Sequence, residues 1–344
     1  MSADDIRMRR KIQQLGSSTL GVTLPADWAR EHEIVKGDEL VVQQDENSGS
    51  LLLVPENPST VDTVARIDAS ELETTALERA ILAQYVLGRQ LIRIEGDRLS
   101  TAHLDAIDGV EARLMGLGVI ECSKQHVDIM CSVAPGDFEL PTLLERMWRT
   151  ESMIRKEASE AFLNADQAGA RRALEYESQA QKLFYLFLRL LFATYRNPRL
   201  NQTMGLETGF PLIGYRSIAQ DVALLTASGC RIARLVDERN QLDGETRTVF
   251  EAALAALDEA VSATCAAVSN PTLESTETAR EAISGLIDTI EQTQHLLETE
   301  RPEPLLTLQR FLSTIRQMGE HASNSLEVAT HLAARSVSTV ETEI

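Results

Sequence analysis

Hydrophobic and polar positions follow two different periods along this chain. Up to about residue 134, short apolar runs alternate with clusters of Gly, Pro, Asn, Asp and Ser, a pattern typical of strands, turns and short helices. From the segment APGDFELP (134–141) onward, apolar residues recur with helical spacing, as they do on the buried face of an α-helix. The pattern therefore predicts a strand-containing first part and an all-helical second part.

The first predicted domain, residues 1–56, consists of hairpins, and Pro55 and Pro58 mark the linker that follows it. About 45 residues of hairpins cannot bury a core alone, so we expect two chains to interleave their strands in a homodimer. The predicted elements are a strand at TLGVTLP (19–25), a helical turn at ADWAREH (26–32), a tight turn at KGDEL (36–40), a strand at ELVVQQ (39–44) and a strand at LLLVP (51–55).

Residues 59–134 form the second predicted domain, a compact α/β module of order β-α-β-α-β-β. Its polar turn near Lys124 and Gln125 places Val127 opposite Cys122, so a disulfide between Cys122 and Cys131 is not expected. All four cysteines are predicted to be small buried hydrophobes. The predicted elements are strands at TVARID (63–68), RQLIRIEG (89–96), GVIECS (118–123) and HVDIMCSV (126–133), and helices at 71–87 and 100–115.

Residues 137–335, the third predicted domain, form six helices. Each break carries Gly, Pro, Asn or Asp, the residues that helix ends require. The helices form two trios of similar length, with Asn164 and Asn270 at corresponding breaks, which predicts two three-helix bundles in tandem. The fold class is therefore α+β multidomain. The breaks fall at 164–167, 196–211, 242–245, 269–272 and 301–304.

Charge and composition limit where the protein works. No apolar run reaches the ~20 residues that span a bilayer, and the N-terminus lacks the apolar stretch of a signal peptide, so we expect a cytoplasmic protein that is not integral to a membrane. The formal net charge is −19, and five of the 33 basic residues are lysines. Such a surface resembles those of halophilic proteins, so the acidity carries little information about partners.

A basic cluster opens this acidic chain and is followed by an uncharged stretch from Ile12 to Ala26. The order of basic arm, GSSTLGVTLPADW (16–28), KGDEL (36–40) and GSLLLVP (49–55) resembles the AbrB/SpoVT-type swapped-hairpin DNA-binding domain. The resemblance implies two interleaved chains whose basic residues contact DNA phosphates, while nearby hydroxyls and amides reach sugar or base edges. The implied phosphate contacts are Arg7, Arg9, Arg10 and Lys11, with Gln13, Ser17, Ser18 and Thr19 nearby.

Two other interpretations of the arm stay open: a solvated tail, and a hairpin domain retained only for dimerisation. No further cation follows Lys11 until Arg30, so the basic footprint is small. Antitoxins also belong to this family, but those are short chains with a disordered toxin-binding tail, whereas this chain continues into folded domains.

The helical region resembles PhoU, the regulator associated with phosphate-uptake transporters, and an AbrB-like domain before a PhoU region is an arrangement seen in archaea. The resemblance implies carboxylates at i and i+4 on one helix face, which hold metal clusters. This chain departs from that pattern, so we expect no metal cofactor. Of the implied set, Glu320 and His321 are the weak candidates that remain, and we expect Arg316 to pair with Glu320. The departures are Gln181, Ala223, Ala227 and Arg316.

No Gly-rich phosphate loop, nucleophile elbow or zinc signature is present, so we expect no enzyme. The leading hypothesis is a DNA-binding transcriptional regulator of phosphate uptake and phosphate homeostasis, with DNA and a second copy of the chain as partners. The alternative is an adaptor that docks on a phosphate transporter ATPase or its signalling kinase and uses the hairpin domain only to dimerise. A metal-storing helical protein is disfavoured by the departures above.

Overall fold

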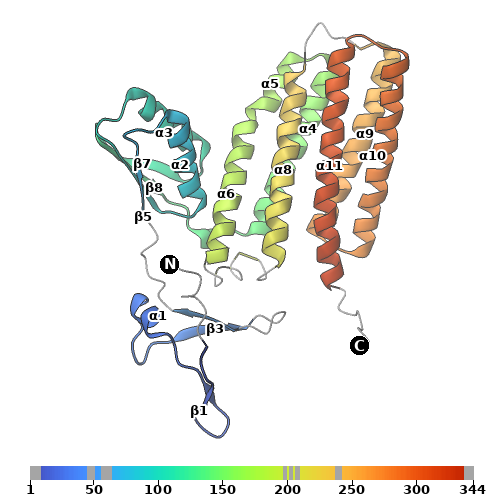
Figure 1. The fold of residues 1–344 in the computed structure, drawn as a ribbon. Helices are drawn as coiled ribbons and strands as arrows, with labels where there is room; N and C mark the ends of the chain where they lie inside the picture. Colours follow the sequence, from blue (N-terminus) through green and yellow to red (C-terminus); the bar gives the residue numbers. More distant parts are fainter. Residues whose placement is uncertain are drawn as a thin grey trace. The chain divides into compact units, whose positions relative to one another are not determined.

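The computed structural model describes residues 9–44, 51–55, 64–196, 200, 204–205, 210–236 and 242–336, so Arg7 lies outside the described residues. The chain divides into two compact units, Met1–Val64 and Ala65–Ile344. The first contains small antiparallel sheets, and the second contains a four-stranded sheet and long helices (Figure 1). The α+β multidomain class predicted from the sequence is confirmed.

The N-terminal unit holds two hairpins and one short helix, α1 (Ala26–Glu31). Strand β1 (Gln13–Gln14) pairs antiparallel with β2 (Leu20–Gly21), and β3 (Leu40–Gln44) pairs antiparallel with β4 (Leu51–Pro55). The predicted turn before β3 is present: Gly37 has a φ of 109°, which a residue without Cβ adopts freely.

The strand predicted over residues 19–25 is shorter in the structure. Strand β2 contains only Leu20 and Gly21, because its partner β1 offers only two residues for pairing. No side chain is buried among residues 9–42, 51, 53 and 55, and several large apolar side chains are exposed. These residues therefore form no core of their own within one chain. The exposed apolar residues are Ile12, Leu15, Leu20, Val22, Val35, Val41, Val42 and Leu51.

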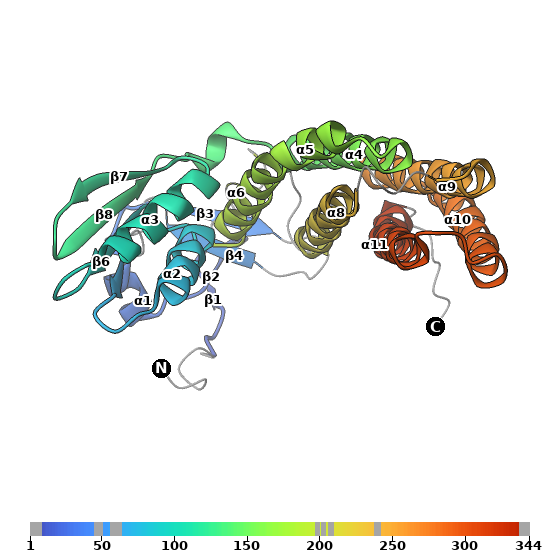
Figure 2. The ribbon, with the colours of Figure 1, turned by 90° about the horizontal axis from the view of Figure 1, so that it is seen from above.

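The second unit begins with the predicted β-α-β-α-β-β order. The sheet order is β5-β6-β8-β7, and α2 and α3 cover one face (Figure 2). The apolar side chains on that face, with Tyr85 of α2, form the core of the module. The elements are β5 (Val64–Asp68), α2 (Thr74–Val86), β6 (Leu91–Glu95), α3 (Thr101–Arg113), β7 (Leu117–Cys122) and β8 (His126–Cys131).

The β7–β8 hairpin has the predicted register, with Cys122 opposite Val127, and all four cysteines are free. Burial of the cysteines differs from the prediction at two of them. Cys131 and Cys230 are buried and Cys265 is partly buried, but Cys122 is exposed, because it lies at the end of β7, an edge strand with a neighbour on one side only.

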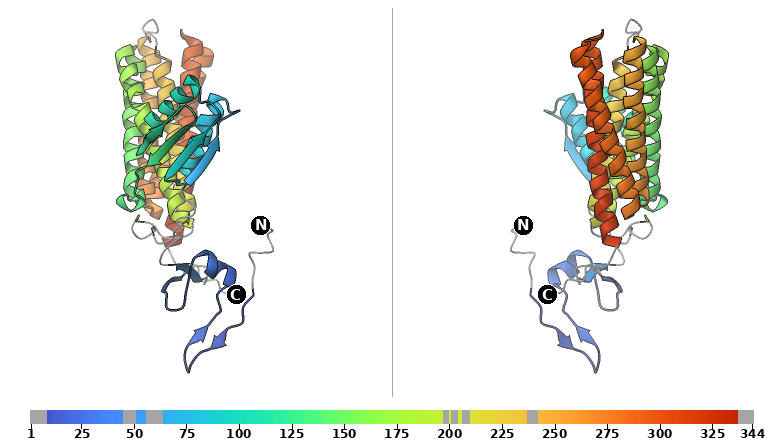
Figure 3. Two further views of the ribbon diagram at one scale, coloured as in Figure 1. Left: turned by 90° about the vertical axis from the view of Figure 1, so that its left-hand side faces the viewer. Right: turned by 90° about the vertical axis from the view of Figure 1, so that its right-hand side faces the viewer.

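Seven described helices make up the rest of the second unit, and they lie side by side (Figure 3). The predicted breaks carry N-capping side chains: Asp166, Asp243 and Thr272 each accept a hydrogen bond from a backbone N–H of the first turn. The helices are α4 (Leu140–Asn164), α5 (Gln167–Glu175), α6 (Glu177–Arg196), α8 (Phe210–Arg234), α9 (Gly244–Ser269), α10 (Leu273–Thr299) and α11 (Leu305–Ser336).

One break was not predicted. The second predicted helix of the first trio is divided at Tyr176 into α5 and α6. No Gly or Pro stands at this break, so the residue types that usually mark a helix end are missing from it.

The two trios share one core. Helices α4, α6 and α8 pack together, as do α9, α10 and α11, and the trios meet where α4 contacts α9 and α8 contacts α11. The ring of Phe311 lies 3.8 Å from that of Phe162 and 5.3 Å from that of Phe250, centroid to centroid. These three rings come from α11, α4 and α9, so aromatic packing joins the first trio to the second.

Helix α9 is long and apolar enough, by length and composition, to cross a membrane. Its apolar side chains nevertheless pack in the shared core: Phe250, Leu257 and Val261 are buried. A core helix of a helical bundle passes the same test of length and composition.

Candidate functional site

The described residues of the predicted DNA-binding set lie together at the first hairpin. Arg9, Arg10 and Lys11 are exposed immediately before β1. Gln13 belongs to β1, and the loop between β1 and β2 is closed by the Leu15 N–H, which donates to the Thr19 carbonyl at 2.9 Å. The predicted residues of this loop, Ser17, Ser18 and Thr19, are all exposed.

The positive charge beside the first hairpin is concentrated in the arm, and the other described cations of this unit are Arg30 and Lys36. The next cation along the chain is Arg30, whose Nη2 lies 2.6 Å from Oδ1 of Asp27. Because this pair neutralises Arg30 locally, Arg9, Arg10 and Lys11 supply the charge that could attract an anionic polymer. The arrangement can contact a phosphate backbone through the arm and present short hydroxyl side chains beside it.

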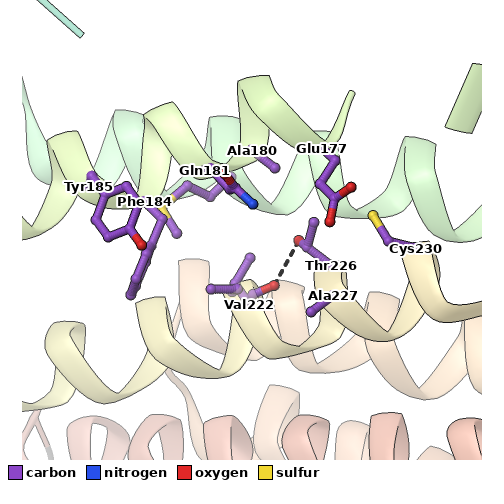
Figure 4. A pocket seen from close by; sticks show the side chains of 11 residues that line it. Glu177, Ala180, Gln181, Phe184, Tyr185, Val222, Thr226, Ala227 and Cys230 are labelled. Carbon is purple, nitrogen blue, oxygen red and sulfur yellow. Dashed lines mark hydrogen bonds between the residues drawn. The ribbon is translucent and has the colours of Figure 1, made fainter. Parts of the chain in front are cut away.

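The first helical repeat has a small groove where the PhoU resemblance implies metal ligands (Figure 4). Glu177 and Gln181 of α6 face Ala223 and Ala227 of α8 around a cavity of about 80 Å³. The sequence thus identified four positions that the structure brings together, but two of them carry methyl groups in place of metal ligands. Met147, Phe184, Tyr185 and Val222 complete an apolar wall.

Three polar groups at this groove, those of Glu177, Thr226 and Cys230, are already occupied or inert. Glu177 Oε2 accepts a hydrogen bond from Arg234 Nη2 at 2.6 Å, and the Thr226 hydroxyl donates to the Val222 carbonyl at 2.8 Å. Burial raises the pKa of the Cys230 thiol to about 11, with the nearby Glu177 carboxylate acting in the same direction. The thiol therefore stays neutral near pH 7 and is not a nucleophile.

The second repeat has a larger groove of about 640 Å³ between α10 and α11. Arg316 Nη2 donates to Gln294 Oε1 at 2.5 Å. The sequence predicted an ion pair between Arg316 and Glu320 one turn on; that prediction is wrong, because the guanidinium crosses to the neighbouring helix instead. The polar side chains that line the groove are Glu291, Gln294, His295, Glu298, Arg316, Glu320 and Ser323.

Each groove is lined by pairs of residues four apart on two neighbouring helices. In the first repeat these are positions i and i+4 of α6 (Glu177, Gln181) and of α8 (Ala223, Ala227). The corresponding helices of the second repeat are α10 and α11, which likewise offer pairs four residues apart. Those pairs are Glu291 with His295, and Arg316 with Glu320.

The two weak metal candidates, Glu320 and His321, face different neighbours. Glu320 lines the α10–α11 groove, whereas His321 Nδ1 lies 3.7 Å from Oδ1 of Asp221 on α8. The Ser325 hydroxyl donates to Asp221 Oδ2 at 3.3 Å, so this serine bonds to the carboxylate and not to the imidazole. Burial raises the pKa of Asp221, and the charge of His321 opposes that rise. Asp221, His321 and Ser325 therefore form a polar contact between the repeats. They do not form a hydrolase triad, in which the serine hydroxyl is hydrogen-bonded to the imidazole.

The donor set does not fit the metal cluster that the PhoU resemblance implies. Among the described residues, no group of three or more His, Cys, Asp or Glu side chains is placed to hold a metal ion. In the first groove Ala223 and Ala227 offer no donor atom, and in the second groove Arg316 places a cation among the carboxylates.

Sequence reasoning missed two buried interactions that organise the helical region. Arg155 Nε lies 2.9 Å from Glu151 Oε1 on its own helix, and its Nη1 lies 2.5 Å from Asp258 Oδ1 on α9. The i, i+4 spacing of Glu151 and Arg155 was a visible signal, but their burial was not. The second interaction joins Arg189 of α6 to the backbone of the module: Nη1 donates to the Tyr85 carbonyl at 2.6 Å.

Two comparisons with known proteins found similarities. Residues 13–60 match the family model described as antidote-toxin recognition MazE, bacterial antitoxin. The crystal structure of PhoU from Pseudomonas aeruginosa is similar, with 14% identity and a TM-score of 0.42 over 57% of this chain and 96% of that one. A search of curated proteins found no match. The hairpin-domain resemblance is confirmed by the family model. Residues 13–60 are therefore similar to the MazE/AbrB type of segment.

Proposed function

We propose that this protein is a cytoplasmic DNA-binding transcriptional regulator of phosphate uptake that acts as a homodimer. The observation that carries the proposal is the exposed basic arm, Arg9 to Lys11, placed directly before the first hairpin of a MazE/AbrB-type segment. In a chain of net charge −19, cations gathered at a hairpin are best explained by an anionic partner, and DNA is the partner that the family resemblance implies.

Dimerisation is supported by what the N-terminal unit leaves uncovered. Leu15, Leu20 and Val42 are among its exposed apolar side chains, and no side chain is buried over residues 9–42. A second copy with the same surface would cover them through a two-fold interface. The same two-fold arrangement would bring two basic arms to one DNA site, which compensates for the small footprint of each.

The link to phosphate rests on the resemblance of the helical region to PhoU. Under this proposal the helical region senses the regulatory signal or docks with a partner protein. The α/β module then transmits the resulting conformational change. The module is suited to that task because Arg189 and Tyr185 of α6 both contact it. A phosphate transporter ATPase or a signalling kinase is the partner that the resemblance implies.

A second function is favoured by a specific observation. Between Lys11 and Arg30 the chain has no cation, and Arg30 is paired with Asp27. A surface so poor in free positive charge also suits an adaptor that binds no DNA and uses the hairpin domain only to dimerise.

The salt dependence of DNA binding distinguishes the two functions. A cognate duplex is first selected from a random library with wild-type protein, and binding is then measured by fluorescence anisotropy across a salt series. Replacing Arg9 and Arg10 with Ala removes about four phosphate contacts per dimer and should flatten the log–log salt slope by roughly three to four units. Arg30→Ala is the matched control, since its pairing with Asp27 predicts an unchanged slope. No selectable duplex, or a double variant with the wild-type slope, would favour the adaptor.

A further inference from the structure

The wall that α10 contributes to the α10–α11 groove changes from apolar to polar along its length. Its side chains are apolar as far as Ile290 and polar from Glu291 onward. The apolar ones follow the i, i+3, i+4, i+7 spacing that places side chains on one face of a helix. From Ile283 to Glu298 this wall is about 22 Å long, as the rise of an α-helix requires. The apolar residues are Ile283, Leu286, Ile287 and Ile290.

The apolar part of the groove leaves one large side chain at the surface. Ile287 is 51% exposed, whereas Leu286 is buried against α11, where a Cβ on Gly319 would lie 3.0 Å from Leu286 Cδ2. Because Gly319 has no side chain, the two helices are in close contact below Ile287. An exposed aliphatic side chain in a groove between two helices is a place where an apolar side chain of a binding partner can pack.

The groove carries dispersed negative charge. Glu291 and Glu298 lie on α10 and Glu320 lies on α11, and all three are exposed. They do not converge, since no group of three or more His, Cys, Asp or Glu side chains among the described residues is placed to hold a metal ion. Arg316, which donates to Gln294 across the groove, offsets part of the charge. Carboxylates spread along both walls suit several cationic side chains spaced along a partner.

We propose that the α10–α11 groove binds an amphipathic helix of a partner protein, whose apolar face packs on Ile287 and whose Lys or Arg side chains lie against Glu291, Glu298 and Glu320. Docking of the apolar face of a helix in a groove is a recurrent mode of recognition. A second copy of this chain is disfavoured as the occupant, because two such grooves placed face to face would bring like charges together. The inference rests on the proposed function only in giving the helical region a docking role, and its test involves no DNA.

The experiment uses full-length protein and a fluorescein-labelled peptide of about 16 residues, the length of the α10 wall. The peptide has Leu at helical spacing on one face and Lys on the other, and a second peptide with Glu in place of Lys is its control. Fluorescence anisotropy gives the dissociation constants, and circular dichroism verifies that each protein variant is folded. We expect the Lys peptide to bind one site per chain and the Glu peptide not to bind.

An apolar substitution tests whether the peptide lies in the groove. Ile287→Asn should weaken binding of the Lys peptide about fivefold, because roughly half of an Ile side chain loses its apolar cover. Leu273→Asn is the matched control, since Leu273 is 60% exposed on the same helix but does not line the groove. Its affinity for the peptide should equal that of wild type.

Charge substitutions test the orientation of the cations. The double variant Glu291→Gln/Glu298→Gln should weaken binding about three- to tenfold, since it removes two exposed charge pairs. Glu274→Gln/Glu281→Gln is the matched control: these residues have the same spacing and are exposed on the same helix, but they lie outside the groove lining. This control should leave the affinity unchanged.

Three results would overturn the proposal. The first is a Lys peptide that does not bind, or that binds folded groove variants and their matched controls equally well. The second is tighter peptide binding by Arg9→Ala/Arg10→Ala, because the basic arm of the chain itself would then occupy the groove. The third is a change in the association state of the full-length protein, measured by sedimentation velocity, when the peptide is added, because a second copy would then be the occupant.

Discussion

Arg189 on α6 donates hydrogen bonds from Nη1 to two backbone carbonyls at the C-terminal end of α2. These are the carbonyls of Tyr85, at 2.6 Å, and of Arg89, at 3.0 Å. The guanidinium also lies over the Tyr85 ring, 5.0 Å from its centroid. Both side chains are buried, and no carboxylate among the described residues pairs with this arginine. A cation at the C-terminal end of a helix is favoured by the helix dipole. This contact fixes the α/β module to the helical bundle.

Replacing Arg189 with Ala should destabilise the second unit by about 2–4 kcal/mol, because two buried carbonyls lose their charged donor and the side chain leaves a cavity. Urea unfolding followed by circular dichroism measures the loss. Arg280→Ala on α10 is the control, since its side chain is exposed and its pair with Glu277 is long, at 3.4 Å; it should cost less than about 0.5 kcal/mol. Equal effects in the two variants would show that Arg189 does not fix the module.

Acid should weaken the α/β module through Asp128, which is buried and accepts two hydrogen bonds from Arg93 across β6 and β8. Hydrogen bonding to Arg93 lowers the pKa of Asp128. The stabilisation is therefore complete above the unfolded-state pKa of about 3.9 and is lost as pH falls through the lower folded-state value. Asp128→Asn should cost about 1–3 kcal/mol at pH 7 and much less at pH 2.

Urea midpoints at pH 7 and at acid pH test this dependence. Asp108→Asn is the matched control, because Asp108 is exposed on α3 and should be neutral at both pH values. A cost for Asp128→Asn that stays the same across the pH range would contradict the role assigned to the Arg93 pair.

Ser18 and Thr19 should affect sequence preference without affecting salt dependence. Both are exposed in the β1–β2 loop beside the basic arm, where uncharged hydroxyls can contact base edges but release no counterions. Each Ala variant should keep the wild-type salt slope and lose preference for the selected duplex over a scrambled one. Fluorescence anisotropy with both duplexes measures the ratio of their affinities. An equal loss of affinity for both duplexes would show that the hydroxyls contact the DNA backbone and not base edges.

Removing residues 1–55 should abolish the dimer. The large apolar side chains exposed in the N-terminal unit are the surface that a second copy would cover, and the shortened chain lacks them. Sedimentation velocity of the full chain and of the truncated chain gives the association state of each. A truncated protein that dimerises as strongly as the full chain would place the interface elsewhere.

Local signals in the sequence predicted much of the fold. Asp166, Asp243 and Thr272 mark helix starts because their short side chains accept backbone N–H groups, so those breaks could be located from residue type. The register that pairs Cys122 with Val127 followed from the polar turn between them. Both features depend on residues close together in the chain.

Features that depend on distant residues were harder to predict. The division at Tyr176 has no helix-breaking residue. Arg316 was expected to pair with Glu320 because residues four apart are neighbours on a helix, but Gln294 of the adjacent helix accepts its hydrogen bond. The carbonyls that Arg189 reaches lie about 100 positions earlier in the chain, and a single sequence does not reveal such a partner.

The stacked rings of Phe162, Phe250 and Phe311 have a consequence for how the tandem repeats unfold. Since each repeat contributes rings to the same stack, neither can melt alone without exposing the aromatic surface of the other, and the pair should denature in one cooperative step. The outer grooves lie outside this stack. We therefore expect substitutions at Ala223 and Arg316, which line those grooves, to leave the shared core and its single unfolding step intact.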